Sequence, residues 1–151
     1  MKRKGIGILA GLAATVVVAM PVLADTTPED AKDYRAAIMT AFRGHIGAAS
    51  MIARGLVDNE GQLVGHAQAL ASSAQELANL WPEGSAVNES ESLPAIWEKP
   101  DEFSEAIDAM VTATAAFAEA AEGGDRAAIG AAFRNVGMSC RGCHDNFRQS
   151  D

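Results

Sequence analysis

The sequence predicts an all-α protein, an antiparallel four-helix bundle with up-down-up-down topology. Apolar residues recur at alternating spacings of three and four in four separate stretches, which is the period of one helix face. No stretch shows the alternation of apolar and polar residues that is typical of a half-buried strand. The stretches are joined mostly by short connections, so consecutive helices are expected to be antiparallel neighbours.

The first helix is expected to begin at Pro28. Thr27 is a favourable N-cap, proline suits the first helical position, and the acidic residues at 29 and 30 favour the positive end of the helix dipole. The sequence at 58–61, Asp-Asn-Glu-Gly, predicts a tight turn. The apolar face before it consists of Ile38, Phe42, His45, Ala49, Ile52 and Leu56.

The second helix is predicted between that turn and Pro82, which cannot continue a helix. Residues 83–98 are rich in Ser, Glu, Gly and Pro and are expected to form the longest loop, with Ile96 and Trp97 returning apolar surface to the domain. Because His45 and His66 lie on apolar faces, we expect packed or interface histidines rather than ligands. The second face consists of Leu63, His66, Leu70, Ala74, Leu77 and Trp81.

The third helix is predicted to begin near Pro100 and to end at Gly123 and Gly124, and Asp125 is expected to cap the fourth. The third face consists of Phe103, Ile107, Met110, Thr114, Phe117 and Ala121. The fourth consists of Ile129, Phe133, Val136, Cys140, Cys143 and Phe147. Flexible methionines fill gaps in cores, so packing roles are expected for Met51, Met110 and Met138.

The only two cysteines lie in the segment Cys140-Arg141-Gly142-Cys143-His144, which has the C-x-x-C-H pattern of covalent c-type haem attachment. Residues three and four apart share one side of a helix, so both thiols and the imidazole face the same way. The thiols can add to the two vinyl groups of the porphyrin while His144 reaches the iron as an axial ligand. The sequence therefore predicts one haem c per chain, held inside the bundle.

Three other interpretations of this segment are less favoured. A redox dithiol is expected in a βαβ context, which the sequence lacks. A zinc site needs a fourth ligand, and His45 and His66 are far away in the sequence. A plain disulfide between Cys140 and Cys143 would not explain why His144 directly follows the second cysteine.

Residues 1–24 have the pattern of a secretory signal peptide, with Lys2-Arg3-Lys4 before an apolar run and a small residue, Ala24, at the cleavage position. We therefore expect a haem domain at 25–151 in the bacterial periplasm, with no stable membrane insertion after cleavage. The alternative, an uncleaved anchor, has an apolar run that is short for a membrane span. Loss of the three basic residues changes the net charge from −8 to −11, which disfavours nucleic-acid binding.

Four segments resemble the class II cytochromes c, and within them the cytochrome c′ family. The segments are residues 34–39, 81–84, 93–97 and 140–148. The motif lies near the C-terminus, whereas class I cytochromes c carry it near the N-terminus. The resemblance covers essentially all of residues 25–151. It implies a periplasmic, usually dimeric four-helix haem protein with five-coordinate high-spin iron, which binds NO and CO and serves electron transport or NO tolerance.

The resemblance also implies roles for four residues outside the motif. Met39, four residues after Arg35, is the residue that shields the distal face of the haem. Arg35 is expected near the propionates, and Glu91 is the loop residue that approaches the haem edge. Arg148 is the basic residue after the motif, on the His144 side of the ring.

The leading hypothesis is a haem protein that carries one electron and binds small gases, and not an enzyme. We expect a homodimer formed by small and apolar residues of the first two helices, such as those at 48–53; the redox partner is not predicted. A low-spin cytochrome c-556-type carrier with Met39 as the sixth ligand stays open. So does a peroxidase-like or NO-detoxifying enzyme, which would need a distal acid–base residue that neither His45 nor His66 supplies at the Met39 position.

Overall fold

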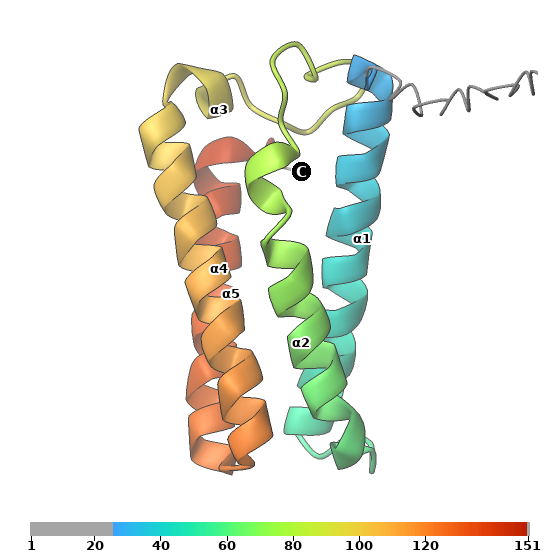
Figure 1. Ribbon diagram of the computed structural model, residues 1–151, viewed down its shortest axis with the longest axis vertical. Helices are drawn as coiled ribbons and strands as arrows, with labels where there is room; N and C mark the ends of the chain where they lie inside the picture. The colour runs from blue at the N-terminus through green and yellow to red at the C-terminus, as the bar shows by residue number, and fades with distance from the viewer. Residues whose placement is uncertain (1–25, 151) are drawn as a thin grey trace, which may run out of the picture.

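The computed structural model describes residues 26–150, which form a helical bundle (Figure 1). Its four long helices are α1 (Pro28–Ala53), α2 (Leu63–Ala74), α4 (Pro100–Gly123) and α5 (Arg126–Phe147). Short elements lie between them: η1 (Glu60–Gln62), η2 (Leu77–Asn79) and α3 (Ala95–Glu98). Within this part of the chain the only β pairing is an isolated bridge between Ser92 and Arg148. The predicted all-α four-helix bundle is confirmed, whereas the predicted signal peptide lies outside the described residues.

The helix ends follow from local chemistry. Thr27 Oγ1 accepts a hydrogen bond from the backbone N–H of Asp30 at 3.1 Å, and Asp125 Oδ1 accepts one from Ala128 N–H at 2.7 Å. Gly124 ends α4 with a φ of 73°, a conformation that glycine adopts without a Cβ clash. The predicted start of α1, end of α4 and start of α5 are therefore confirmed.

Two helices are shorter than the sequence pattern predicted. Gly55 has a φ of 67°, so α1 ends at Ala53 and Leu56 is 59% exposed instead of buried. The last turn of α2 tightens because Gln75 N–H bonds to Ser72 O, three residues back. The chain continues as η2 and still buries Leu77.

The packing of the helices leaves one side of the bundle open. α4 packs along α5 and α2, and α2 packs along α1, whereas α1 touches α5 at few positions. The pairs α1–α2 and α4–α5 stand side by side in Figure 1, and the connection from α2 to α4 crosses the end where α1 begins. The backbones of α1 and α5 therefore stay apart along most of their length.

The core is built from the predicted apolar faces. Fully or nearly fully buried side chains from these faces include Phe42, Ala49, Ile52, Leu63, Leu70, Ala74, Leu77, Phe103, Ile107, Met110, Phe117, Ala121, Ile129, Val136 and Phe147. The packing role predicted for Met51 and Met138 is wrong, because both lie outside the buried faces and are 46% and 64% exposed. Residues 26–150 contain no helix that is both long and apolar enough to span a membrane.

Candidate functional site

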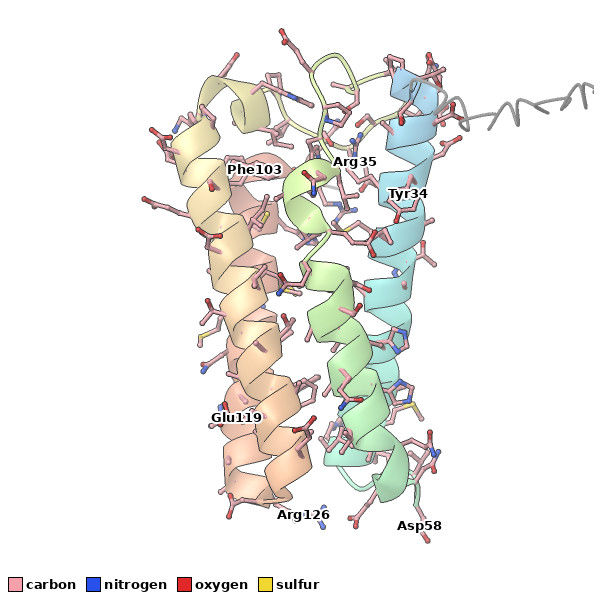
Figure 2. All side chains as sticks on the ribbon, in the orientation of Figure 1. Tyr34, Arg35, Asp58, Phe103, Glu119 and Arg126 are labelled. Carbon is pink, nitrogen blue, oxygen red and sulfur yellow. The ribbon has the colours of Figure 1, made fainter. Side chains whose placement is uncertain are left out.

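A cavity of about 620 Å³ lies between α1, α4 and α5, at the end covered by the α2–α4 connection. This volume falls in the range of about 300–1,000 Å³ that is usual for small-molecule and cofactor sites. Figure 2 shows Arg35 and Phe103 at this end of the bundle, and Asp58 and Arg126 at the other. Its apolar wall includes Met39, Phe42, Ile46, Ile107, Met110 and Phe147.

The last turns of α5 bring the motif to this cavity. Cys140 and Cys143 are half-buried, His144 is more exposed, and all three line the cavity. Burial raises the pKa of the Cys143 thiol to about 11 and also raises that of Cys140, so both thiols are uncharged at neutral pH. Burial lowers the pKa of His144, and the neighbouring charge of Arg148 lowers it further. A neutral imidazole is the form that binds a metal.

A contact that the sequence did not predict supports the first cysteine. Ser139 Oγ donates to Val136 O at 2.9 Å and lies 3.2 Å from Met110 Sδ, and Cys140 Sγ lies 3.8 Å from that Met110 sulfur. The only sequence feature that could have indicated a role for Ser139 is its position directly before the motif. The contact joins α4 to α5 at the point where the motif begins.

Arg35 is buried in the wall of the cavity and holds the 80–90 loop. Nη1 donates to Leu80 O at 2.8 Å and to Ser85 Oγ at 3.1 Å, and Nη2 donates to Ser85 O at 3.0 Å and to Ser90 Oγ at 3.2 Å. The guanidinium carbon also lies 5.6 Å from the centre of the Trp81 ring. Burial lowers the pKa of Arg35, although a guanidinium stays protonated in proteins. Arg35 therefore places a positive charge among neutral oxygens beside the cavity.

Glu91 and Arg148 join the rim of the cavity to the end of α5. Arg148 Nε donates to Glu91 Oε2 at 2.6 Å, and this hydrogen bond is the main cause that lowers the pKa of Glu91. The backbone reinforces the contact, since Leu93 N–H bonds to Phe147 O at 3.0 Å and Gln149 N–H bonds to Glu91 O at 2.7 Å. The loop before α3 is thereby fastened one turn beyond the motif.

Met39 reaches the same cavity from α1, the helix that faces α5 across the open side. It is half-buried and packs against the core. The cavity thus brings together every site residue that the sequence or the resemblance predicted: Arg35, Met39, Glu91, Cys140, Cys143, His144 and Arg148. The histidines at 45 and 66 do not line it and instead contact each other.

These residues fit a c-type haem. Two thiols and an imidazole on one face of α5 line an apolar cavity of cofactor size, and the charged side chain of Arg35 lies in its wall. A sequence profile of the family described as Cytochrome C′ matches residues 30–148. The chain belongs to the cytochrome c′ family. The family resemblance expected from the sequence is confirmed, and with it the haem c cofactor, because its relatives are haem c proteins and both motif cysteines are present.

Individual relatives agree with this assignment. The chain is 37% identical to "Cytochrome c-554" of Cereibacter sphaeroides over 142 residues, which cover 89% of the chain and 92% of the relative. It is 34% identical to "Cytochrome c'" of Pararhodospirillum photometricum over 124 residues, covering 82% and 99%. A solved nitric oxide complex of a cytochrome c prime variant from Alcaligenes xylosoxidans superimposes with a TM-score of 0.75 at 27% identity, covering 82% and 97%.

Proposed function

We propose that this cytochrome c′-family protein is a periplasmic haem protein that transfers one electron and binds small uncharged ligands such as NO and CO at a mostly five-coordinate iron. One observation carries the proposal: Cys140, Cys143 and His144 open from α5 into an apolar cavity that Met39 faces from α1. Periplasmic export rests on the signal pattern of residues 1–24.

Each residue has a defined task in this proposal. Cys140 and Cys143 form the two thioether tethers and fix the orientation of the porphyrin against α5. His144 would offer a ring-nitrogen lone pair to the iron, and Met39 would shield the cavity from α1. Haem c, when bound, supplies one-electron redox chemistry and a coordination position for a diatomic gas. The apolar wall excludes water and disfavours charged ligands.

Two observations support gas binding rather than enzymatic catalysis. Solved relatives from Alcaligenes xylosoxidans carry nitric oxide or carbon monoxide. His45 and His66 point to each other across α1 and α2 and do not line the cavity, which argues against either as the distal acid–base residue of a peroxidase.

A second candidate function follows from Met39 itself. Met39 is on α1, which faces the helix that carries His144. A methionine side chain is flexible enough for its sulfur to bind iron as a sixth ligand. The protein would then be a low-spin electron carrier without an open gas site. The two candidates differ in a single bond, so spectroscopy separates them.

The surface of α1 and α2 supports a homodimer. Gly44, Gly47 and Gly65 lie inside these helices, are exposed, and a Cβ on any of them would meet nothing within 4 Å. Glycine inside a helix costs about 1 kcal/mol relative to alanine, and no contact in the described chain offsets that cost. The exposed Met51 adjoins these glycines on α1. We propose that a second copy packs closely against this face.

Absorption spectra of the purified protein test the function directly. We expect the broad bands of high-spin haem in the ferric and ferrous forms and a clear change when CO is added to the ferrous form. Acid–acetone treatment should leave the pigment on the polypeptide. A pigment that extracts freely would overturn covalent attachment, and a ferrous spectrum indifferent to CO would favour the low-spin candidate.

A further inference from the structure

A pair of histidines lies apart from the haem cavity. His45 of α1 and His66 of α2 place their Nδ1 atoms 3.0 Å apart. The ring centres are 5.3 Å apart and the ring planes are tilted by 54°. Both side chains are half-buried, and neither lines the cavity that holds Cys140 and Cys143. The proposed haem chemistry therefore makes no use of this pair.

Three small side chains flank the two rings. The half-buried neighbours three or four residues from His45 on its outer side are Ala41 and Ala48, and Ala69 stands in the same relation to His66. These side chains are small and apolar, so they do not compete for the ring nitrogens. Both histidines are partly exposed in a single chain, so water can reach the pair where a second copy on the α1–α2 face does not cover it.

The hydrogen bond between the rings has one proton for two nitrogens. One Nδ1 must carry the hydrogen and the other must offer its lone pair. A neutral imidazole nitrogen is also the commonest protein ligand for a transition-metal ion. We propose that His45 and His66 form a two-imidazole site for a divalent transition-metal ion, which binds both Nδ1 atoms while the shared proton moves to Nε2 of the ring that carried it. The ion is Cu²⁺ in preference to Ni²⁺ or Zn²⁺, following the usual order of affinity for nitrogen ligands.

The distance between the nitrogens suits this proposal. Ligand nitrogens lie about 2.0–2.1 Å from such a metal, so two adjacent ligands are about 2.9 Å apart at a right angle and about 3.3 Å apart at the tetrahedral angle. The observed 3.0 Å lies between these values. Each ring must turn by about 40° so that both lone pairs meet at one ion rather than face each other, by the same geometry.

Water completes the coordination. No group of three or more His, Cys, Asp or Glu side chains gathers at a possible metal position in residues 26–150. The protein therefore supplies two ligands, one from each of two packed helices. Binding would cross-link α1 to α2 and stabilise the folded state by mass action.

The test uses untagged holoprotein that has been treated with a chelator, which does not remove covalently held haem. Calorimetric titration with CuCl₂ should give one saturable site per histidine pair, and H45Q or H66Q should weaken it at least tenfold. The double variant H45Q/H66Q should abolish the site. The matched control D58N/E60Q removes two carboxylates from the nearby turn and should bind like the wild type, since the proposal gives that turn no role.

A second readout separates a metal site from a merely structural hydrogen bond. Adding CuCl₂ or ZnCl₂ should raise the Tm of the wild type and slow amide exchange around residues 45 and 66, with neither change in the double variant. An unchanged haem spectrum checks that the variants fold. The proposal fails if the double variant binds with wild-type affinity, or if each single variant retains the full affinity of the pair.

Discussion

Arg35 makes two hydrogen bonds to Ser85, one to its hydroxyl oxygen at 3.1 Å and one to its backbone oxygen at 3.0 Å. Ser85 is completely buried, although it lies in a loop rich in polar residues. A single charged side chain from α1 therefore holds the covering loop in place fifty residues further along the chain. The same side chain adds a buried positive charge to the cavity wall.

Replacement of Arg35 by methionine should destabilise the protein by about 3 kcal/mol, because hydrogen bonds to charged groups contribute about 1.5–3 kcal/mol each and buried acceptors would lose their donor. R35K should restore only part of this, since an ammonium lacks the forked geometry. Guanidinium unfolding followed by circular dichroism measures the loss. The control K99M changes an exposed cation and should stay within about 0.5 kcal/mol of wild type.

The Glu91–Arg148 ion pair should make stability fall on acidification. Arg148 lowers the pKa of Glu91 below its ordinary value of 4.5. A carboxylate with a depressed folded pKa stabilises the fold above its unfolded pKa and loses that contribution as the pH falls through the folded pKa. The contribution is small, about 0–1 kcal/mol, because Glu91 is 59% exposed.

Denaturant midpoints measured from pH 6 to pH 3 check this pair. E91Q should lie below the wild type at pH 6, and the two curves should converge below pH 4.5. E83Q, which alters an exposed carboxylate of the same loop, should follow the wild type throughout. A constant difference between E91Q and wild type down to pH 3 would show that the charge of Glu91 is not what matters.

M39A distinguishes the two states of the iron. If Met39 only shields the open side, the ferrous spectrum of M39A should match the wild type and CO should bind several-fold faster, because a steric gate has gone. If Met39 is a ligand, the wild type should show a sharp low-spin α band that M39A loses. M39L, which keeps the bulk without the sulfur, serves as the control and should behave like wild type only under the first reading.

G47L should break the proposed homodimer. Leucine favours the helix more than glycine does, so the fold of each chain is kept while the side chain blocks close approach. Light scattering at micromolar concentration should report the dimer mass for wild type and the monomer mass for G47L. The control G137L alters an exposed glycine of α5 and should remain dimeric. A monomer mass for the wild type would remove the proposal.

Removal of both tethers should leave a poorly packed protein. An unfilled cavity of about 620 Å³ would deprive its apolar lining of packing partners, and the far smaller cavities left by single Leu→Ala changes already cost about 3–5 kcal/mol. C140A/C143A without haem should therefore show fast amide exchange in α5 and a broad unfolding transition. Exchange as slow as in the holoprotein would contradict this expectation.

The sequence predicted the helix caps and apolar faces, because these features depend on residues close together in the chain. The caps at Thr27 and Asp125 are local, since each accepts from a backbone N–H three residues ahead. The four apolar faces follow from helix period alone. The early end of α1 was missed because the face pattern continued to Leu56 after the φ of Gly55 had already left the helical region.

The residues that line the cavity could be predicted from the sequence, but the contacts between them could not. The motif identified Cys140, Cys143 and His144 because covalent haem attachment requires this spacing of two thiols and an imidazole. The bonds of Arg35 to Ser85 were not predictable, since the partner sits in a loop without periodicity. The His45–His66 contact depends on how α1 is rotated and shifted along α2, which no single helix pattern contains.

Because the cavity lies between α1 and α5, haem insertion depends on the order in which these two helices become available. One wall is formed by residues near position 39 and the other by residues after position 139, so no partial chain contains the complete pocket. Once the bundle has closed, both sulfurs are half-buried and poorly ionised. Thioether formation is therefore expected to precede final closure, on a polypeptide whose α1 and α4 segments have already been delivered. Because the motif follows α1 and α4 in the sequence, the residues that complete the pocket arrive after those two helices.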